Sequence, residues 1–376
     1  MTLLHRRTRI AASLFTSVIF LGATLFLAAC GADSEQSAPG EDAAPETLDA
    51  ADHAQPGETH LRNVRQLTFG GENAEAYWAF DGSVLIYQAR KPGAGCDQIY
   101  IMDDLETGES RMVSTGEGRT TCSYFYPSGD QILYSSTHLA DPACPPVPDF
   151  SQGYVWPIYE SYDIFTADAD GGNLRRLTET DGYDAEATFS PVGGRIVFTS
   201  MRDGDLELYS MAPDGSDVQR LTNRIGYDGG AFYSPDGSQI VWRAHYPEPG
   251  PEQDDYLRLL EQGLLRPGEL DIYVMDADGS NMRQVTHLGG ANFAPYWHPD
   301  GKRILFSSNH EDSNGREFEI YMIGVDGTGL TRITHSEAFD GFPVFSPDGR
   351  YLAFGSNRNN EGTNDTNIFL AEWVEE

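Results

Sequence analysis

Short apolar and aromatic runs alternate with turns rich in Gly, Asp and Pro along most of this chain. One such pattern, an aromatic run, a Gly-containing turn and a second apolar run, occurs six times. The copies read WAFDGSVLIYQA, FYPSGDQILYSS, FSPVGGRIVFTS, YSPDGSQIVWRA, WHPDGKRILFSS and FSPDGRYLAFGS, with turn glycines Gly82, Gly129, Gly193, Gly237, Gly301 and Gly349. Successive glycines are 47, 64, 44, 64 and 48 residues apart. A spacing near 45 residues with two long insertions predicts a repeat architecture.

Each repeat contains four runs of the length and alternation expected of strands. The third runs are Gln98–Met102, Asp163–Ala167, Glu207–Met211, Asp271–Met275, Glu319–Ile323 and Asn367–Ala371. An Asp-Gly turn follows most of them, and a fourth run then ends in Thr. Gly and Asp supply the positive φ angles of tight hairpins. Four antiparallel strands repeated in this way predict the blades of a β-propeller.

The two ends of the repeat region are complementary. The last repeat has three runs and no fourth, whereas an unpaired fourth-strand sequence, Val64–Thr68, precedes the first repeat. We therefore expect this N-terminal strand to complete the last blade, which removes the open sheet edges that promote aggregation. The fold class predicted is all-β, a six-bladed β-propeller closed by an N-terminal strand.

The SPDG-containing repeats resemble those of the TolB-like family of WD-type propellers, from Val64 to about Trp373. This resemblance implies the propeller fold, but related propellers act as scaffolds, lyases and peptidase regulators. TolB carries an α/β domain before its propeller. Here an acidic linker takes that place, so the chain resembles a TolB-like propeller lipoprotein without the TolB N-terminal domain.

The N-terminal residues have the features of an export signal. Arg6, Arg7 and Arg9 precede the apolar stretch Ile10–Leu27, and Leu-Ala-Ala-Cys ends at Cys30. This pattern predicts a lipoprotein signal peptide over residues 1–29 and lipidation of Cys30, with a plain signal peptide or anchor helix as the alternative. Residues 30–60 are predicted to be an acidic flexible tether, and residues 61–376 the propeller.

The predicted location is the periplasmic side of a bacterial cell envelope, held by the lipid anchor. Gly31 and not Asp follows the cysteine, which favours the outer membrane over the inner one, but the sequence does not settle which membrane holds the anchor. The formal net charge of −33 argues against nucleic acid and anionic membrane surfaces as partners. Membrane contact is therefore expected through the anchor only, and we expect a monomer.

Cys96, Cys122 and Cys144 remain after lipidation of Cys30. In an oxidising compartment we expect one disulfide and one free thiol. Three pairings are possible, and the sequence does not choose among them.

Both long insertions join the second and third strands of a repeat, so they lie on the same face of the ring. They span His138–Glu160 and His245–Glu269. Tyr154 and Trp156 of the first insertion are candidate ligand-binding residues, with packing over the second blade as the alternative. In the second insertion a short helix is expected near Glu252–Leu264, its apolar face packed on the propeller, with a partner-binding helix as the alternative.

A polar position stands nine residues before each turn glycine, where the inner strands begin. It is occupied by Asn73, Thr120, Asp184, Asp228, Asn292 and Asp340, and Glu75 and Glu186 lie two residues further on. Three interpretations stay open for this ring of positions. The side chains cap turns and pair with neighbouring Arg; or they bind a ligand, with Asp184, Asp228 and Asp340 holding Ca²⁺ at the channel mouth; or His138, His245 and His310 hold a transition metal, as in the propeller-fold oligogalacturonate lyases.

The sequence has no G-x-S-x-G nucleophile motif, no phosphate-binding glycine loop and no H-E-x-x-H. No catalytic residue is assigned. We expect a non-enzymatic binding module or scaffold for an envelope protein or a small ligand. The alternative is a metal-using propeller enzyme such as an oligogalacturonate-lyase-like carbohydrate lyase.

Overall fold

A computed structural model describes residues 51–312, 315, 317–360 and 362–375. The predicted signal peptide, Cys30 and most of the predicted tether lie outside the described residues. Among the described residues, no helix has the length and apolar character needed to cross a bilayer.

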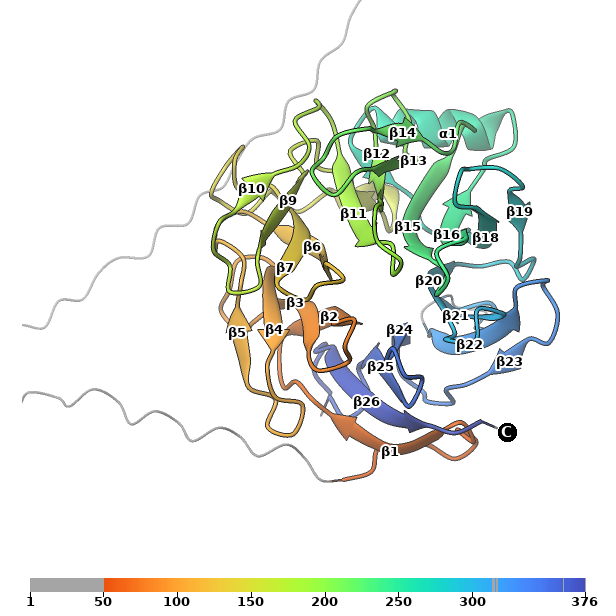
Figure 1. The fold of residues 1–376 in the computed structure, drawn as a ribbon. Helices are drawn as coiled ribbons and strands as arrows, with labels where there is room; N and C mark the ends of the chain where they lie inside the picture. The colour runs from red at the N-terminus through yellow and green to blue at the C-terminus, as the bar shows by residue number, and fades with distance from the viewer. Residues whose placement is uncertain (1–50, 313–314, 316, 361, 376) are drawn as a thin grey trace, which may run out of the picture. The chain divides into compact units, whose positions relative to one another are not determined.

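The described chain forms six four-stranded antiparallel sheets arranged in a ring (Figure 1). Each sheet is one blade, and its first strand lies nearest the axis. Blade one contains β2 (Glu72–Trp78), β3 (Leu85–Arg90), β4 (Gln98–Met102) and β5 (Ser110–Met112), and blade two contains β6 (Thr120–Phe125), β7 (Gln131–Ser136), β9 (Asp163–Asp168) and β10 (Arg175–Arg176). Blade three contains β11 (Asp184–Phe189), β12 (Ile196–Ser200), β13 (Glu207–Met211) and β14 (Gln219–Arg220), and blade four contains β15 (Tyr227–Tyr233), β16 (Gln239–His245), β18 (Asp271–Asp276) and β19 (Arg283–Gln284). Blade five contains β20 (Asn292–Trp297), β21 (Arg303–Ser308), β22 (Glu319–Gly324) and β23 (Thr331–Arg332), and blade six contains β24 (Asp340–Phe345), β25 (Tyr351–Ser356), β26 (Asn367–Trp373) and β1 (Leu61–Gln66). The predicted fold class is confirmed.

The ring closes through the strand that the sequence left unpaired. Strand β1 pairs antiparallel with β26, with Leu61 opposite Trp373 and Gln66 opposite Phe369. Val64 of β1 is fully buried. The first and last parts of the propeller are therefore held in one sheet, as the missing fourth run predicted.

The turn that defines the repeat is built from its own side chains. In the fourth copy, the Ser234 hydroxyl and the Ser238 amide both donate to Asp236 Oδ1, at 2.6 and 3.0 Å. Gly237 follows with φ +70°, and a Cβ there would lie 2.4 Å from Val192 Cγ2. The motif thus combines an acceptor, two donors and a residue that tolerates positive φ. These hydrogen bonds hold the pKa of Asp236 at about 2.

Aromatic pairs form the core of each blade. The residue five positions after each turn glycine is aromatic and almost fully buried, and it lies opposite an aromatic residue of the third strand. The pairs are Tyr87–Tyr100, Tyr134–Phe165, Phe198–Tyr209, Trp242–Tyr273, Phe306–Tyr321 and Phe354–Phe369, with ring centroids 5.6–6.3 Å apart. Such cross-strand pairs stabilise each sheet beyond simple burial.

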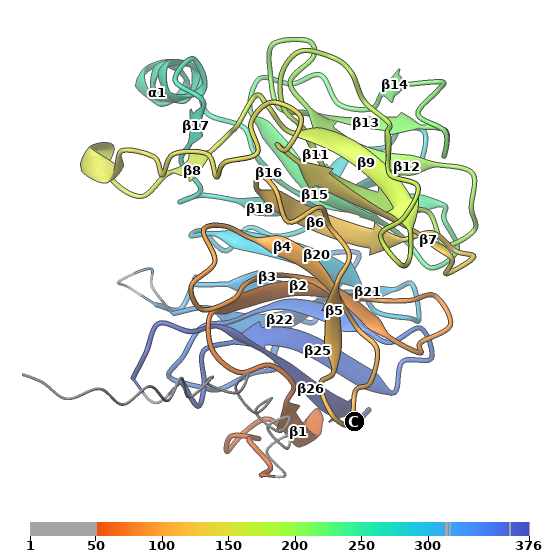
Figure 2. The same ribbon diagram turned by 90° about the vertical axis from the view of Figure 1, so that its left-hand side faces the viewer.

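The two insertions lie next to each other on one face of the propeller (Figure 2). The first contains a short 3₁₀ helix, η1 (Phe150–Gln152), and strand β8 (Trp156–Pro157), and the second contains helix α1 (Pro251–Leu260) and strand β17 (Leu264–Leu265). Strands β8 and β17 pair with each other. The predicted helix is present but shorter than expected, because its last turn gives way to β17. Tyr256 and Leu260 are buried, whereas Leu257 is exposed on the outer side.

Candidate functional site

The ring of polar positions at the starts of the inner strands joins neighbouring blades. In every blade the backbone N–H at this position donates to a carbonyl just before the third strand of the preceding blade. The pairs are Asn73 with Thr366, Thr120 with Asp97, Asp184 with Tyr162, Asp228 with Leu206, Asn292 with Leu270 and Asp340 with Phe318, at 2.8–3.1 Å. All six residues are buried. They form joints between blades and do not line an open channel mouth, which corrects the expected placement.

Among the described residues, the structure does not bring Asp184, Asp228 and Asp340 together as one ligand set. Each carboxylate is engaged within its own blade. Asp184 pairs with Arg202 at 3.0 Å and Asp340 with Arg358 at 2.7 Å. Asp228 accepts hydrogen bonds from the Trp242 indole and the Tyr246 hydroxyl. Burial raises the pKa of Asp228 well above its usual value. This favours the neutral carboxyl group over the carboxylate that would bind a cation.

The three histidines are also apart. His138 Nδ1 is hydrogen-bonded to Ser136 at 2.8 Å, and His310 Nδ1 to Ser308 at 2.9 Å. Among the described residues, His245 instead lies close to Glu252 and Glu269 of the second insertion. The expected three-histidine metal site is therefore not formed.

A small axial cavity is lined by the residues that follow the joint residues by two positions in the sequence. Its lining includes the residue seven positions before each turn glycine, namely Glu75, Cys122, Glu186, Gly230, Ala294 and Phe342. All six have positive φ, between 49° and 60°, and each lies in a bulge of its inner strand. The cavity measures about 30 Å³, enough for a few water molecules. The same irregularity in all six inner strands thus builds one lining from six dissimilar side chains.

A buried ion pair crosses this cavity. Arg243, from the second strand of blade four, pairs with Glu186 of blade three, and both side chains are nearly buried. Arg243 Nε also donates to the Tyr227 hydroxyl at 3.0 Å, while Thr199 and the Gly230 amide donate to Glu186. A Cβ on Gly230 would lie 2.0 Å from Arg243 Nη1. The glycine in blade four therefore makes room for the guanidinium.

The remaining carboxylate of the cavity belongs to Glu75, and its pKa is raised. Burial raises the pKa of Glu75 to about 7, while a hydrogen bond from Cys122 and the charge of Arg243 oppose the rise. Burial also raises the pKa of the Cys122 thiol well above its usual value, with Glu75 and Glu186 adding to the effect. Cys122 is therefore a protonated thiol and not an activated nucleophile.

Tyr154 and Trp156 lie together in the first insertion. The Trp156 indole donates to the Tyr154 hydroxyl at 3.1 Å, and the Tyr154 side chain is 69% exposed. On its other side Trp156 contacts Phe293 edge to face, and the Arg243 guanidinium lies 5.5 Å from its ring centre. The two aromatic residues thus extend from the axial cavity to the outer surface of the insertions.

A disulfide fixes the first insertion to the first blade. It joins Cys96, just before β4, to Cys144 of the insertion and leaves Cys122 as a free thiol in the axial cavity. The sequence indicated Glu75 and Glu186 but not Arg243 or the place of Cys122. Alignment on the turn glycines gives the equivalence of Cys122 with the two glutamates. Arg243 stands outside that set, and only the three-dimensional contact with Gly230 shows its place.

Sequence and structure comparisons agree with this architecture. A family model described as the TolB beta propeller domain matches residues 158–248 and 272–365. An uncharacterised protein of Agrobacterium fabrum is 30% identical over 150 residues, which are 39% of this chain and 46% of that protein. The aligned part of the chain thus spans about half the length of this relative.

Solved structures show the same fold at low identity. A TolB candidate from Agrobacterium tumefaciens has a TM-score of 0.52 and 19% identity, and covers 81% of this chain and 91% of its own. An oligogalacturonate lyase in complex with manganese has a TM-score of 0.52 and 16% identity, with 87% and 97% covered. The chain is a six-bladed β-propeller. It belongs to the TolB-like propellers.

Proposed function

We propose that this protein is a non-enzymatic binding module that presents the face bearing the two insertions to an envelope protein or ligand. The observation that carries the proposal is the joined pair of insertions. Strand β8 of the first pairs with β17 of the second, Leu265 opposite Trp156. Arg258 and Arg266 of the second insertion both bond Gln152 of the first. Recognition residues commonly stand on loops that a rigid scaffold positions.

The exposed surface of the first insertion suits a protein partner. Leu139, Val147, Phe150 and Tyr154 are between 48% and 74% exposed. Aromatic and aliphatic side chains of this kind form the centres of protein interfaces, where they lose water on binding. The Cys96–Cys144 disulfide limits the conformational freedom of the loop, so less entropy is lost when a partner binds.

Two observations weigh against the alternative of a metal-using carbohydrate lyase. The axial cavity of about 30 Å³ is far smaller than the ~300–1,000 Å³ of sites that enclose small molecules. His138 and His310 are bonded within their own blades and do not converge with His245. The likeness to the lyase therefore concerns the fold.

The proposal includes export and tethering. We propose that residues 1–29 are a lipoprotein signal peptide, that Cys30 is lipidated and that the acidic segment to residue 60 holds the propeller on the periplasmic side of the envelope. Cys30→Ser is expected to move the protein from the membrane fraction to the soluble periplasmic fraction. Membrane association of this variant would contradict the tether.

The binding proposal is tested by crosslinking the intact lipoprotein in its native envelope and identifying the partner by mass spectrometry. Tyr154→Ala and Phe150→Ala should each remove the crosslinked partner. Val218→Ala is the matched control, because Val218 is 40% exposed and lies between the third and fourth strands of blade three, at the opposite end of the strands from the insertions. A partner that survives both aromatic substitutions, or that depends on Val218, would refute this assignment of the binding face.

A further inference from the structure

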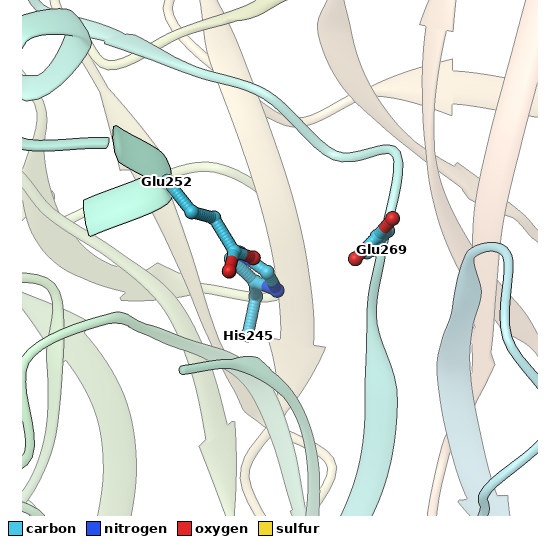
Figure 3. A group of neighbouring side chains, drawn as sticks. All are labelled: His245, Glu252 and Glu269. Atoms are coloured by element: carbon cyan, nitrogen blue, oxygen red, sulfur yellow. The ribbon is translucent and has the colours of Figure 1, made fainter. Parts of the chain in front are cut away.

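The second insertion is closed at its base by three side chains with metal-ligand chemistry. His245 is the last residue of β16, Glu252 lies in the first turn of α1, and Glu269 comes just before β18 (Figure 3). One donor atom from each lies within 4.8 Å of the other two. The insertion therefore begins and ends at this group, and its only helix contributes the third donor.

The spacing of the donors suits a small divalent ion. His245 Nε2 and Glu252 Oε1 are 3.3 Å apart. Two ligands of a tetrahedral zinc ion, each about 2.0–2.2 Å from the metal, stand roughly 3.3–3.5 Å from each other. The histidine and the first glutamate already have this separation, and a carboxylate oxygen of the exposed Glu269 side chain lies within 4.8 Å of both.

The charges of the group also favour a cation. Two carboxylates lie close together, and among the described residues no Lys or Arg forms an ion pair with either. Glu252 Oε2 accepts the Glu248 amide at 3.0 Å, which orients the carboxylate and leaves Oε1 directed at the imidazole. Hydrogen bonding that fixes a ligand from outside the metal shell is a regular feature of protein metal sites.

The neighbouring carboxylate of Asp271 is not a ligand. Its oxygens accept the Thr286 hydroxyl and the Gln284 amide, both at 2.8 Å. The donor set is therefore one imidazole nitrogen and two carboxylate oxygens, and because both glutamates are exposed, water can supply a fourth ligand. One nitrogen and two oxygens with an open position suit Zn²⁺ better than Ca²⁺, which takes six to eight oxygen ligands.

We infer that His245, Glu252 and Glu269 form a Zn²⁺ site that closes the second insertion. The ion would link the start of the insertion, its helix and its end, and closing a loop in this way restricts the unfolded insertion more than the folded one. Because β17 of this insertion pairs with β8, the ion would also steady Trp156 in the first insertion. This inference does not depend on the identity of any partner.

The test uses the untagged full-length protein, freed of metal with EDTA and titrated calorimetrically with ZnCl₂. We expect one Zn²⁺ per chain. His245→Ala, Glu252→Gln and Glu269→Gln should each weaken binding about tenfold or more, the loss typical even of residues that support a metal ligand. Glu261→Gln, an exposed glutamate at the end of the same helix, should bind as the parent does.

A second measurement separates loss of the site from loss of the fold. Zn²⁺ should slow amide hydrogen exchange in β8 and β17 of the parent and not of the Glu269→Gln variant, while far-ultraviolet circular dichroism stays the same for both. No zinc binding, unchanged affinity in all three variants, or loss of binding only in Cys122→Ser would overturn the inference. Binding of Ca²⁺ in preference to Zn²⁺ at the same residues would overturn the choice of ion.

Discussion

Replacement of Arg358 by methionine should destabilise the propeller far more than the same change at Arg90. Both arginines lie where the second strand of a blade ends: Arg358 two residues after β25 in blade six, and Arg90 at the last residue of β3 in blade one. Arg358 bonds Glu58 and Asp340 at 2.9 and 2.7 Å, and its side chain is 4% exposed while both carboxylates are 0% exposed. Arg90 pairs with Glu72, with side chains 40% and 54% exposed.

The burial of the two pairs sets the expected magnitudes. Removing one partner from a buried ion pair costs about 3–5 kcal/mol, because a charge is left without compensation. An exposed pair contributes about 0–1 kcal/mol. In the Arg358 variant Glu58 keeps the amides of Gln55 and His335, and Asp340 keeps the Ser336 hydroxyl. We therefore expect a loss near 3 kcal/mol for Arg358→Met and below 1 kcal/mol for Arg90→Met.

Equilibrium urea unfolding at pH 7, followed by circular dichroism, measures both values. Methionine retains much of the apolar contact that Arg358 makes over the Phe354 ring, 5.1 Å from its centre, so the difference reports the charge. An unchanged slope of the unfolding free energy against urea concentration would show that parent and variant expose the same surface on unfolding, so that their free energies can be compared. Equal losses in the two variants, or a loss below about 1 kcal/mol for Arg358→Met, would refute the reasoning from burial.

Three further changes test other parts of the molecule. Because the pKa of Glu75 is raised from 4.5 to about 7 in the folded state, the free energy of unfolding should fall by up to about 3 kcal/mol as the pH rises through this range. Glu75→Gln should flatten this pH dependence, measured as urea midpoints from pH 4.5 to 8. An equal slope in the variant would count against Glu75 as its source. Loss of the disulfide in Cys96→Ser, which opens a 48-residue separation, should cost about 2–4 kcal/mol by thermal unfolding; a melting temperature equal to that of the parent would contradict its role. Deletion of Leu61–Thr68 leaves blade six with an open edge and should abolish cooperative melting in calorimetry, whereas a deletion that melts like the parent would rule out closure through β1.

The sequence predicted the fold well because the fold depends on what the six repeats share. Turn glycines, the aromatic residues that follow them and the incomplete last repeat are all local features. Each has one structural solution, a tight hairpin, a buried cross-strand pair or a closing strand. Alignment of the copies was therefore enough to give blade number, strand order and closure.

The site was harder to predict because it depends on side-chain direction. Asp184, Asp228 and Asp340 share a repeat position, which suggested that they converge on the axis. Their side chains turn instead into their own blades, where each bonds an arginine or two aromatic donors. Residues at the same repeat position lie at the same level of the ring. The bulge two residues later determines which side chains line the axial cavity.

At the bulge, the six blades share a backbone conformation but differ in their side chains. Left-handed backbone at a residue other than glycine costs of order 1 kcal/mol or more, yet five of the six blades carry it at this position. The irregularity is thus a property of the packed ring, while the side chains placed there differ in charge, size and polarity in every blade except those with Glu75 and Glu186. Where six copies agree, the residues hold the ring together; where the backbone is the same and the side chains differ, they are free to form a site. By the same reasoning we propose that a partner is recognised on the two insertions, which only blades two and four carry.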